Sequence, residues 1–289
     1  GFYNNFDFII KNVNSDTQNS KSFKEDENYY LSGLFQFNSS LPLIKESDKH
    51  QKILKPKLSL KLSPQDTKNL SNEEIRLDAT NIYSLDRLSK NDTLEGGLSL
   101  AVGNEFTVFD KIKSRDILSL KLATNLRNEE NNDLPDYNQL GQKTSNFFGE
   151  IDYNPIEFLS MKYSTSVKNN VKDVNYQNLI TQLSLNNFVT TFDYLNENNT
   201  KDKNSYLLNT TSYALNRSNK LIFSTRENKT LDLTEYYNLM YQYKNDCLAA
   251  SIEYNKEYYD DRDIKPEENI FLKLTIIPFG ETSSPNLKK

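Results

Sequence analysis

The chain has 289 residues, with 35 Lys and Arg against 40 Asp and Glu, for a formal net charge of -5. This mild negative charge and the absence of a basic tract exclude the electrostatic footprint of a nucleic-acid-binding protein. The 18 Tyr and 16 Phe are too many for a disordered chain, and 8 Gly and 8 Pro are too few for a glycine-rich fibre. No run of roughly 18 apolar residues occurs, so no transmembrane helix is predicted.

In chain order, the predicted elements are strands, because apolar and polar residues alternate along most of the chain. The stretches KPKLSLKL (55–62), RDILSLKLATNL (115–126) and EFLSMKYSTSVK (157–168) each place apolar side chains on one face and polar ones on the other. We predict about fourteen antiparallel strands, each near the ~9–11 residues that cross a membrane. Their spans are 2–12, 28–38, 51–62, 94–109, 115–127, 144–153, 157–168, 173–186, 188–197, 203–215, 219–227, 233–243, 246–259 and 268–279.

The connections between these strands alternate between short and long. The link at 244–246 is short, whereas those at 63–93 and 128–143 are long; the longish connection at 39–50, on the short-turn side, is the main exception. Short turns at one end and long loops at the other are typical of a transmembrane β-barrel, whose wet interior also explains the polar faces and the mean hydropathy of -0.74. We therefore predict an all-β, antiparallel transmembrane β-barrel. Tyr and Phe near the strand ends suit interfacial girdles or are ordinary sheet aromatics.

Two stretches carry more than this general pattern. Residues 41–106 contain a proline-bearing strand and then a long loop, and residues 236–280 contain Cys247, an acidic loop and a last strand that ends in Phe279 and Gly280. The spaced residues of the first stretch are Asp78, Asn81, Ser84, Arg87, Asp92, Glu95 and Gly97. In order and spacing, the two stretches resemble the C-terminal barrel of the LptD family, the lipopolysaccharide (LPS) assembly translocons. The chain departs from the family where two adjacent cysteines are common, because Leu248 follows Cys247 here, and where DRLSKND (86–92) replaces a fuller motif.

The resemblance implies a domain organisation and a function. Residues 1–280 would form the C-terminal half of a larger barrel and 281–289 a tail; the family's periplasmic jelly roll and first barrel half lie outside this sequence. The protein would reside in the outer membrane of a Gram-negative bacterium. It would insert LPS into the outer leaflet through a lateral gate between the first and last barrel strands. This is transport rather than catalysis, so no catalytic residue, metal site or cofactor is expected.

The last predicted strand, 268–279, would form one edge of that gate. The alternation gives it a lipid-facing row of Ile270, Leu272, Leu274 and Ile276. Pro278 removes one ladder hydrogen bond near the end of the strand. This creates either the weak seam that an opening gate needs or a simple strand terminator.

Cys247 is the single cysteine, so it has no partner for a disulfide within the chain. An inert thiol is the plain interpretation. The family instead forms a long-range disulfide between barrel and periplasmic domain, which implies a partner cysteine outside this sequence. The alternation places Cys247 in the polar row of its strand, with Ala249 and Ser251.

The resemblance also implies partners. These are LPS itself, an LptE-type lipoprotein plug in the lumen, a periplasmic bridge protein that docks on the absent N-terminal domain, and the barrel-assembly machinery. Within the long loop, Arg87 would pair with Asp86 or Asp92, or contact LPS phosphates. The acidic run YYDDRD (258–263) suits a divalent cation or is a solvated loop.

Other functions stay open on the strand pattern alone. A porin or a TonB-dependent receptor passing small solutes would show the same alternation. A soluble all-β binding module would instead bury its apolar faces between sheets. An outer-membrane hydrolase needs a general base, and the only histidine, His50, falls in a predicted periplasmic connection.

Overall fold

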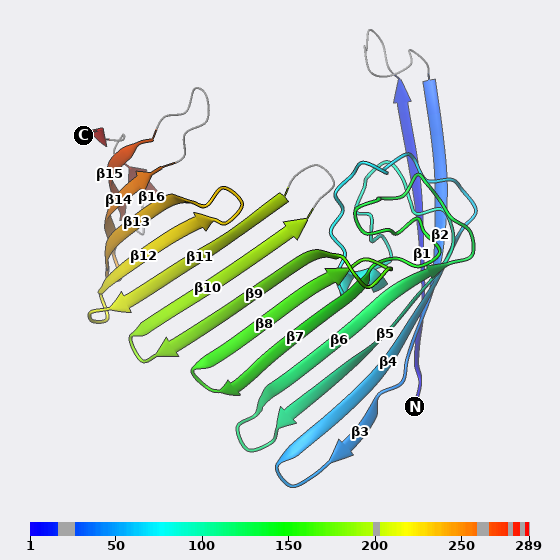
Figure 1. The fold of residues 1–289 in the computed structure, drawn as a ribbon, viewed down its shortest axis with the longest axis horizontal. Coiled ribbons are helices and arrows are strands. Elements are labelled where there is room, and N and C mark those ends of the chain that lie inside the picture. The colour runs from blue at the N-terminus through cyan, green and yellow to red at the C-terminus, as the bar shows by residue number, and fades with distance from the viewer. Residues whose placement is uncertain (17–26, 199–202, 259–265, 277–279, 284–286, 289) are drawn as a thin grey trace. The chain divides into compact units, whose positions relative to one another are not determined.

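The computed structural model describes residues 1–289 except 17–26, 199–202, 259–265, 277–279, 284–286 and 289. Within these residues the chain forms β-strands and one 3-10 turn, η1 (Asn81–Tyr83), as Figure 1 shows. No helix in this part of the chain is long and apolar enough to cross a membrane. The strands are β1 (Tyr3–Asp16), β2 (Glu27–Ser40), β3 (Leu43–Glu46), β4 (His50–Ser63), β5 (Gly97–Asp110), β6 (Arg115–Arg127), β7 (Phe147–Ile156), β8 (Leu159–Val167), β9 (Val174–Leu185), β10 (Phe188–Asn198), β11 (Lys203–Ala214), β12 (Asn219–Asn228), β13 (Leu233–Lys244), β14 (Leu248–Glu257), β15 (Glu268–Ile276), β16 (Gly280–Ser283) and β17 (Leu287–Lys288).

The predicted all-β, antiparallel class is confirmed, and each predicted segment overlaps one long strand; residues 259 and 277–279 of the predicted spans lie outside the described residues. β6 has the predicted bounds, 115–127, because its alternation is unbroken. Three short strands, β3, β16 and β17, were not predicted. β3 lies within the 39–50 connection and pairs with β4, which explains the unusual length of that link.

The chain divides into two compact units. Unit 1 comprises residues 1–152 and 164–175. In it, β1 pairs with β2, β2 with β4, β4 with β5, and β5 with β6, all antiparallel. Pro56 stands opposite Asn104 in the β4–β5 ladder, where it donates no hydrogen bond.

Unit 2 comprises residues 153–163 and 176–289. Its strands from β9 to β15 follow one another in chain order, each antiparallel to the next. One register shift occurs in β12, between Arg226 and Glu227. β16 and β17 both pair with β15.

The apolar face of the sheet is exposed and the polar face is more buried, which is the reverse of a soluble protein. In unit 1 the apolar row, which includes Phe6, Leu62 and Leu122, is exposed, whereas the polar row, with Lys61 and Asn125, is buried. In unit 2 the exposed row is again apolar. It contains Phe192, Tyr213, Leu239, Ile252 and Leu272. A soluble sandwich would bury its apolar rows, so this arrangement favours an apolar face turned toward lipid.

Candidate functional site

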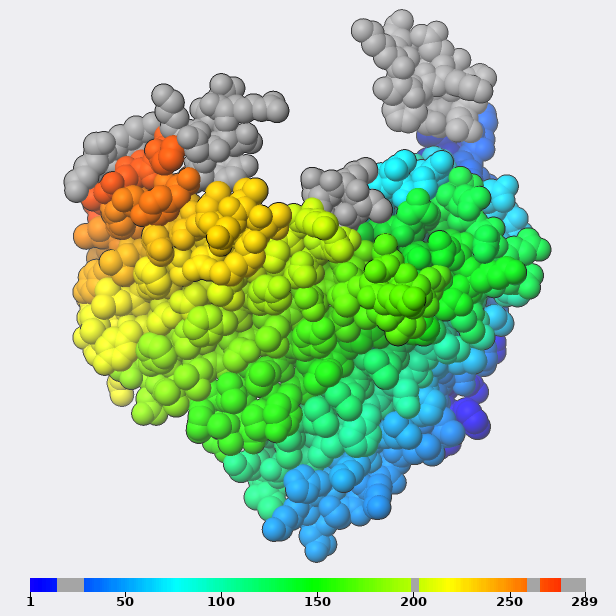
Figure 2. All heavy atoms as spheres, viewed as in Figure 1, coloured from blue at the N-terminus to red at the C-terminus, as the bar shows by residue number. Residues whose placement is uncertain are grey.

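The candidate site is a pair of long loops that packs on the polar face of unit 1. We define the loop cluster as residues 64–96 and 128–146; in Figure 2 their cyan and green atoms lie against one another. Apolar side chains of the loop cluster pack with residues of β5, β6 and β7 into one buried core. The members are Leu70, Leu77, Ala79, Ile82, Leu88, Leu134 and Leu140 from the loops, and Ala101, Ala123 and Phe148 from the strands. The two loops therefore form a packed layer. The sequence had predicted only that they are long.

Small residues on the strands allow this close approach. A Cβ atom built on Gly103 of β5 would lie 2.1 Å from the Tyr83 hydroxyl and 2.2 Å from the Leu122 carbonyl oxygen. Only glycine therefore fits under Tyr83. Burial, together with the negative charge of Glu105, raises the pKa of the Tyr83 phenol well above its usual range.

A buried ion-pair network holds the loop cluster together. Arg87 binds Glu95 twice, with Nε–Oε2 at 2.6 Å and Nη2–Oε1 at 2.5 Å, and the Arg87 side chain is fully buried. Arg127, the last residue of β6, binds the same Oε1 at 2.6 Å. Ser99 donates a further hydrogen bond to Glu95 (3.0 Å). One carboxylate thus joins the loop to β5 and β6.

The electrostatics of Glu95 follow from its neighbours. Burial alone would raise its pKa, but the positive charges of Arg87, Lys61 and Arg127 and the hydrogen bonds from Arg87 lower the pKa well below the usual range. Glu95 is therefore ionised at all physiological pH values. Its role is that of a fixed anion rather than of a proton donor.

Side chains of three strands also form hydrogen bonds with the first loop, residues 64–96. Lys11 of β1 pairs with Asp86 at 2.5 Å and donates to two backbone carbonyls of the loop. Lys61 of β4 donates to two other loop carbonyls. Gln36 of β2 donates to the carbonyl of Tyr83 at 2.6 Å.

The second loop is tied to the first and to unit 1 strands. The amide N–H of Leu70 donates to the carbonyl of Asp133 at 2.7 Å, and the two loops meet again where Asn138 donates to the carbonyl of Ile75 at 2.8 Å. The side chain of Asn146 donates to Ser166 at 2.9 Å. These hydrogen bonds join the two loops to each other and to the strands of unit 1.

Several motif residues prove to be folding elements of this cluster. Asp78 and Asn81 cap each other: Asp78 Oδ1 accepts from the Asn81 amide (2.7 Å), and Asn81 Oδ1 accepts from the Asp78 amide (2.8 Å). Gly97 has a φ of 84°, in the region that favours glycine, where the loop enters β5. Asp92 is exposed and pairs with Lys68 at 3.1 Å.

One expectation about this loop was wrong. Arg87 pairs with neither Asp86 nor Asp92, because its guanidinium points into the buried network and binds Glu95. Lys61 and Arg127 also belong to this network and were not predicted from the sequence. The one sequence feature that could have indicated them is a basic residue near the end of a strand's polar row, next to a long loop.

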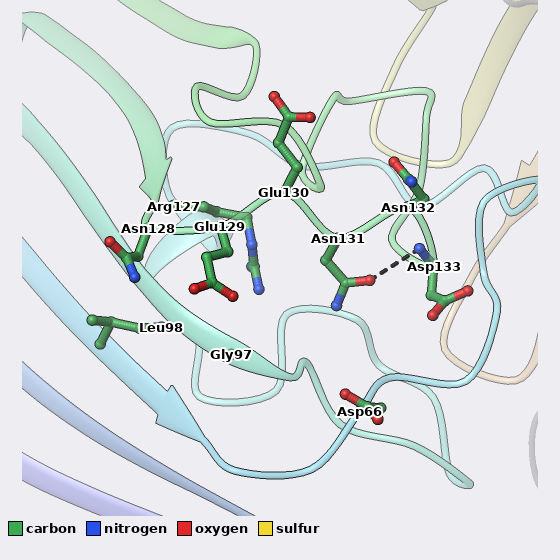
Figure 3. Close-up of a pocket in the computed structure, with 10 residues that line it drawn as sticks. All are labelled: Asp66, Gly97, Leu98, Arg127, Asn128, Glu129, Glu130, Asn131, Asn132 and Asp133. Atoms are coloured by element: carbon green, nitrogen blue, oxygen red, sulfur yellow. Dashed lines mark hydrogen bonds between the residues drawn. The ribbon is translucent and has the colours of Figure 1, made fainter.

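A polar pocket of about 520 Å³, open to the outside, lies between the loop cluster and the ends of β5 and β6, and Figure 3 shows the residues that line it. Arg127, Glu129 and Glu130 are among the residues that line it. The amide of Asp133 donates to Asn131 Oδ1 at 3.0 Å along one wall. Asp66 borders the cavity from the first loop.

The predicted gate strand is β15, and its apolar row is on one face. Ile270, Leu272 and Ile276 are exposed there, and Leu274 is half-buried. Pro278 lies outside the described residues.

Cys247 is exposed, and the strand predicted to begin at residue 246 begins two residues later. It lies in the turn before β14, which begins at Leu248, so the strand alternation does not extend to it. Asn245 Oδ1 holds this turn by accepting from the amides of Cys247 (3.0 Å) and Leu248 (2.7 Å).

Two other sequence predictions concern acids and bases. His50 is the first residue of β4 and not part of a connection, because β3 and β4 are joined by a tighter turn. Of the run YYDDRD, residues 259–263 lie outside the described residues. Within the described part of the chain, no group of three or more His, Cys, Asp or Glu could hold a metal ion.

Comparison with known proteins gives a family and a set of structural neighbours. No curated protein matches the chain. Among solved structures, one described as "Asymmetric conductivity of engineered proteins" is 10% identical, with 89% of this chain and 95% of that chain covered and a TM-score of 0.34. A triple mutant of the Rhodopseudomonas blastica porin is 8% identical, with 99% and 98% covered and a TM-score of 0.35. The family model "LPS transport system D" (LptD) matches residues 9–236. Because this match spans most of the chain, the protein belongs to the LptD family of LPS transport proteins.

Proposed function

We propose that this chain is the C-terminal part of an outer-membrane LPS translocon, and that it inserts LPS into the outer leaflet through a lateral gate. The observation that carries the proposal, together with family membership, is the contrast between the two faces of the sheet. LPS has fatty-acyl chains and a large polar sugar. An exposed apolar face and a polar face, such as Leu272 and Lys273 on adjacent positions of β15, supply an environment for each.

The gate would open at the edge of β15. The row of Ile270, Leu272 and Ile276 suits contact with acyl chains as they leave. The strand that faces β15 across the gate would belong to the first half of the barrel. Separating two strands requires breaking backbone hydrogen bonds, so a shorter or weaker ladder at this edge lowers the barrier.

The sugar would follow the polar face. In unit 2 this face carries polar side chains that bind one another, for example Asn178 with Asp193 (2.5 Å) and Arg226 with Glu235 (2.8 Å). Polar groups of this kind can exchange hydrogen bonds with sugar hydroxyls.

The loop cluster would act as a fixed cover over part of the route. It occupies the polar face of unit 1, so passage along that face is blocked while the Arg87–Glu95–Arg127 network is intact. An LptE-type plug would contact the remaining polar surface. The periplasmic bridge protein and the barrel-assembly machinery complete the proposed set of partners, and Cys247 would bond to a cysteine of the periplasmic domain.

The function is tested by depleting the full-length protein from cells and restoring it from a plasmid. We expect newly made LPS to disappear from the surface, measured by binding of an LPS-specific antibody to intact cells, and to return on restoration. Flux of small sugars into liposomes carrying the purified protein is measured in parallel. Normal surface LPS after depletion, combined with rapid sugar flux, would overturn the proposal in favour of a porin.

A further inference from the structure

Two lysines stand directly opposite one another at the end of unit 1 that carries the short β3–β4 and β5–β6 turns, which we call the short-turn end. Lys45 of β3 and Lys52 of β4 are cross-strand partners, and both side chains are exposed. Figure 1 shows β3 beside the lower part of β4. Opposite side chains of an antiparallel pair have Cβ atoms about 5 Å apart, so two like charges there are unfavourable.

These lysines lack an acidic partner in the part of the chain that the structure describes. No ion pair involves Lys45 or Lys52 there. Two acids at this end are bound elsewhere: Glu46 pairs with Lys111 at 3.0 Å, and Asp110 accepts backbone amides of the β5–β6 turn. On the polar face, by contrast, lysines of β4 and β6 bind carboxylates of β5 and β7 at 2.5 Å. The charge of the Lys45–Lys52 pair is therefore not neutralised by a neighbouring carboxylate.

The pair borders the exposed apolar row of β4. Lys52 shares a face with this row, because alternate positions of a strand lie on one face. The row consists of Leu54, Pro56, Leu58, Leu60 and Leu62. It covers about 27 Å along the strand and, at a tilt of about 40°, about 21 Å across a membrane. Since the apolar band of a transmembrane barrel is about 25 Å tall, a membrane around this row places Lys52 among the lipid headgroups.

An apolar hollow of about 540 Å³ lies beside this row. It forms where β2 ends, at Ser40, and before β3 begins, at Leu43, so that β4 has no continuous neighbour on that edge. Its apolar lining residues are Phe2, Phe37, Leu41, Pro56, Leu58 and Val102. Pro56 lies four positions from Lys52, about 14 Å along the strand. One leaflet supplies about half of the ~30 Å hydrocarbon core, so an acyl chain whose headgroup is at Lys52 reaches the hollow.

We propose that Lys45 and Lys52 bind the phosphate of an anionic glycerophospholipid in the leaflet on the short-turn side, and that one of its acyl chains lies in the hollow. The inference rests on the outer-membrane placement proposed above. An anionic headgroup is attracted by the two ammonium groups and offsets their mutual repulsion. The lysine stems contact the apolar row while their charges stay at headgroup level.

Native mass spectrometry of the purified full-length protein in detergent measures this binding. The probes are phosphatidylglycerol, which is anionic, and phosphatidylcholine, which carries a phosphate but no net charge. We expect the wild type to bind phosphatidylglycerol about 30-fold more tightly, the effect of two lysines near an anionic lipid. Lys45→Gln with Lys52→Gln should remove this preference and leave phosphatidylcholine binding unchanged. Lys45→Arg with Lys52→Arg should retain the preference.

Two further variants separate the parts of the site. Lys220→Gln with Lys244→Gln removes the same charge from the polar row of unit 2, beside its short turns, and should leave the preference intact. Ser39→Phe fills the hollow, which Ser39 lines, and should weaken phosphatidylglycerol binding without any change of charge. The heat-modifiability of the folded band verifies that each variant is folded.

Several outcomes would overturn the proposal. Equal affinity of the wild type for the two lipids is one, and equal loss of preference in the unit 2 variant is another. Unchanged binding in Ser39→Phe would overturn the place of the acyl chain. Displacement of phosphatidylglycerol by an equal concentration of purified LPS would overturn the assignment to a glycerophospholipid.

These outcomes are separable from failure of the proposed function. Lipid binding is measured on the purified protein, whether or not the protein exports LPS. Normal surface LPS after depletion of the whole protein would overturn the export function and leave the lipid site in place.

Discussion

Arg87 and Glu95 form a two-contact ion pair inside the loop cluster, at 2.5 and 2.6 Å, with almost no solvent exposure of either side chain. Arg127 binds the same carboxylate from the end of β6 at 2.6 Å. Buried charges of this kind are costly when a partner is removed, because the remaining charge has neither water nor a counter-ion. The network is therefore the place where a single substitution separates the loops from the sheet.

We expect Glu95→Ala to loosen the whole loop cluster. The change leaves Arg87 and Arg127 buried without their anion, and removing one partner of a buried pair costs about 3–5 kcal/mol. Limited proteolysis of the purified protein should show new cleavage within residues 64–96. The β-sheet circular dichroism should change little, because the strands do not depend on this carboxylate.

The matched control is Asp92→Ala, in the same loop. Asp92 and Lys68 form an exposed ion pair, so removing the pair should lower the free energy of unfolding by at most about 1 kcal/mol. Equal cleavage in the two variants would contradict the idea that burial, rather than loss of a charge as such, controls the loop cluster.

The lowered pKa of Glu95 predicts how the loop cluster responds to acid. Its pKa in the folded protein lies below the unfolded value of about 4.3, so the ion pair stabilises the cluster fully above that value. The contribution is lost as the pH falls through the lower, folded-state pKa. Pepsin cleavage between pH 4 and 2 should therefore rise steeply within residues 64–96 of the wild-type protein.

Glu95→Gln serves as the pH control, because it cannot ionise. Its loop cluster should be cleaved more than the wild-type cluster at pH 4, and the difference should shrink toward pH 2. A constant difference across this range would mean that another group controls the acid response.

Gly103→Ala tests the contact between the loop cluster and β5. The new methyl group would overlap the Tyr83 hydroxyl and the Leu122 carbonyl oxygen, so both must shift. We expect the free energy of unfolding to fall by about 1–3 kcal/mol. The measurement is the temperature at which the folded band is lost on a heat-modifiability gel. Gly33→Ala is the control, since its nearest neighbour, the Phe8 ring, is 3.7 Å away.

The disulfide proposed for Cys247, which is exposed, should be visible in the full-length protein. Non-reducing and reducing gels should show a mobility difference that disappears in Cys247→Ser. A double variant, Cys247→Ser with Arg217→Cys, places the thiol in the neighbouring turn and should not restore the difference. A thiol at Cys247 that reacts readily with maleimide, with no mobility difference, would rule out the disulfide.

Much of the fold could be predicted from the sequence because strand alternation is a local property. β6 was predicted to the residue, and the apolar row of β15 was read directly from alternate positions. The strand ends were less accurate where a loop residue continues the pattern. β5 begins at Gly97 and not at residue 94, because the positive φ of Gly97 ends the loop there.

The candidate site was predictable only in part. The spacing of Asp78, Asn81, Arg87 and Glu95 marked the loop, but their partners did not follow from it. Arg87 bonds to Glu95 within the loop, and both meet Arg127, a contact that spans 32 residues from Glu95. No local pattern encodes such a pairing.

The sequence by itself thus determined the antiparallel strands and their two faces, because each depends on residues two positions apart. Only the tertiary structure decided that the long loops pack on the polar face, that Tyr83 lies over Gly103, and that β16 and β17 pair with β15. These features join residues far apart in the chain. They arise from burial, ion pairing and edge hydrogen bonding, which exist only once the strands are in register.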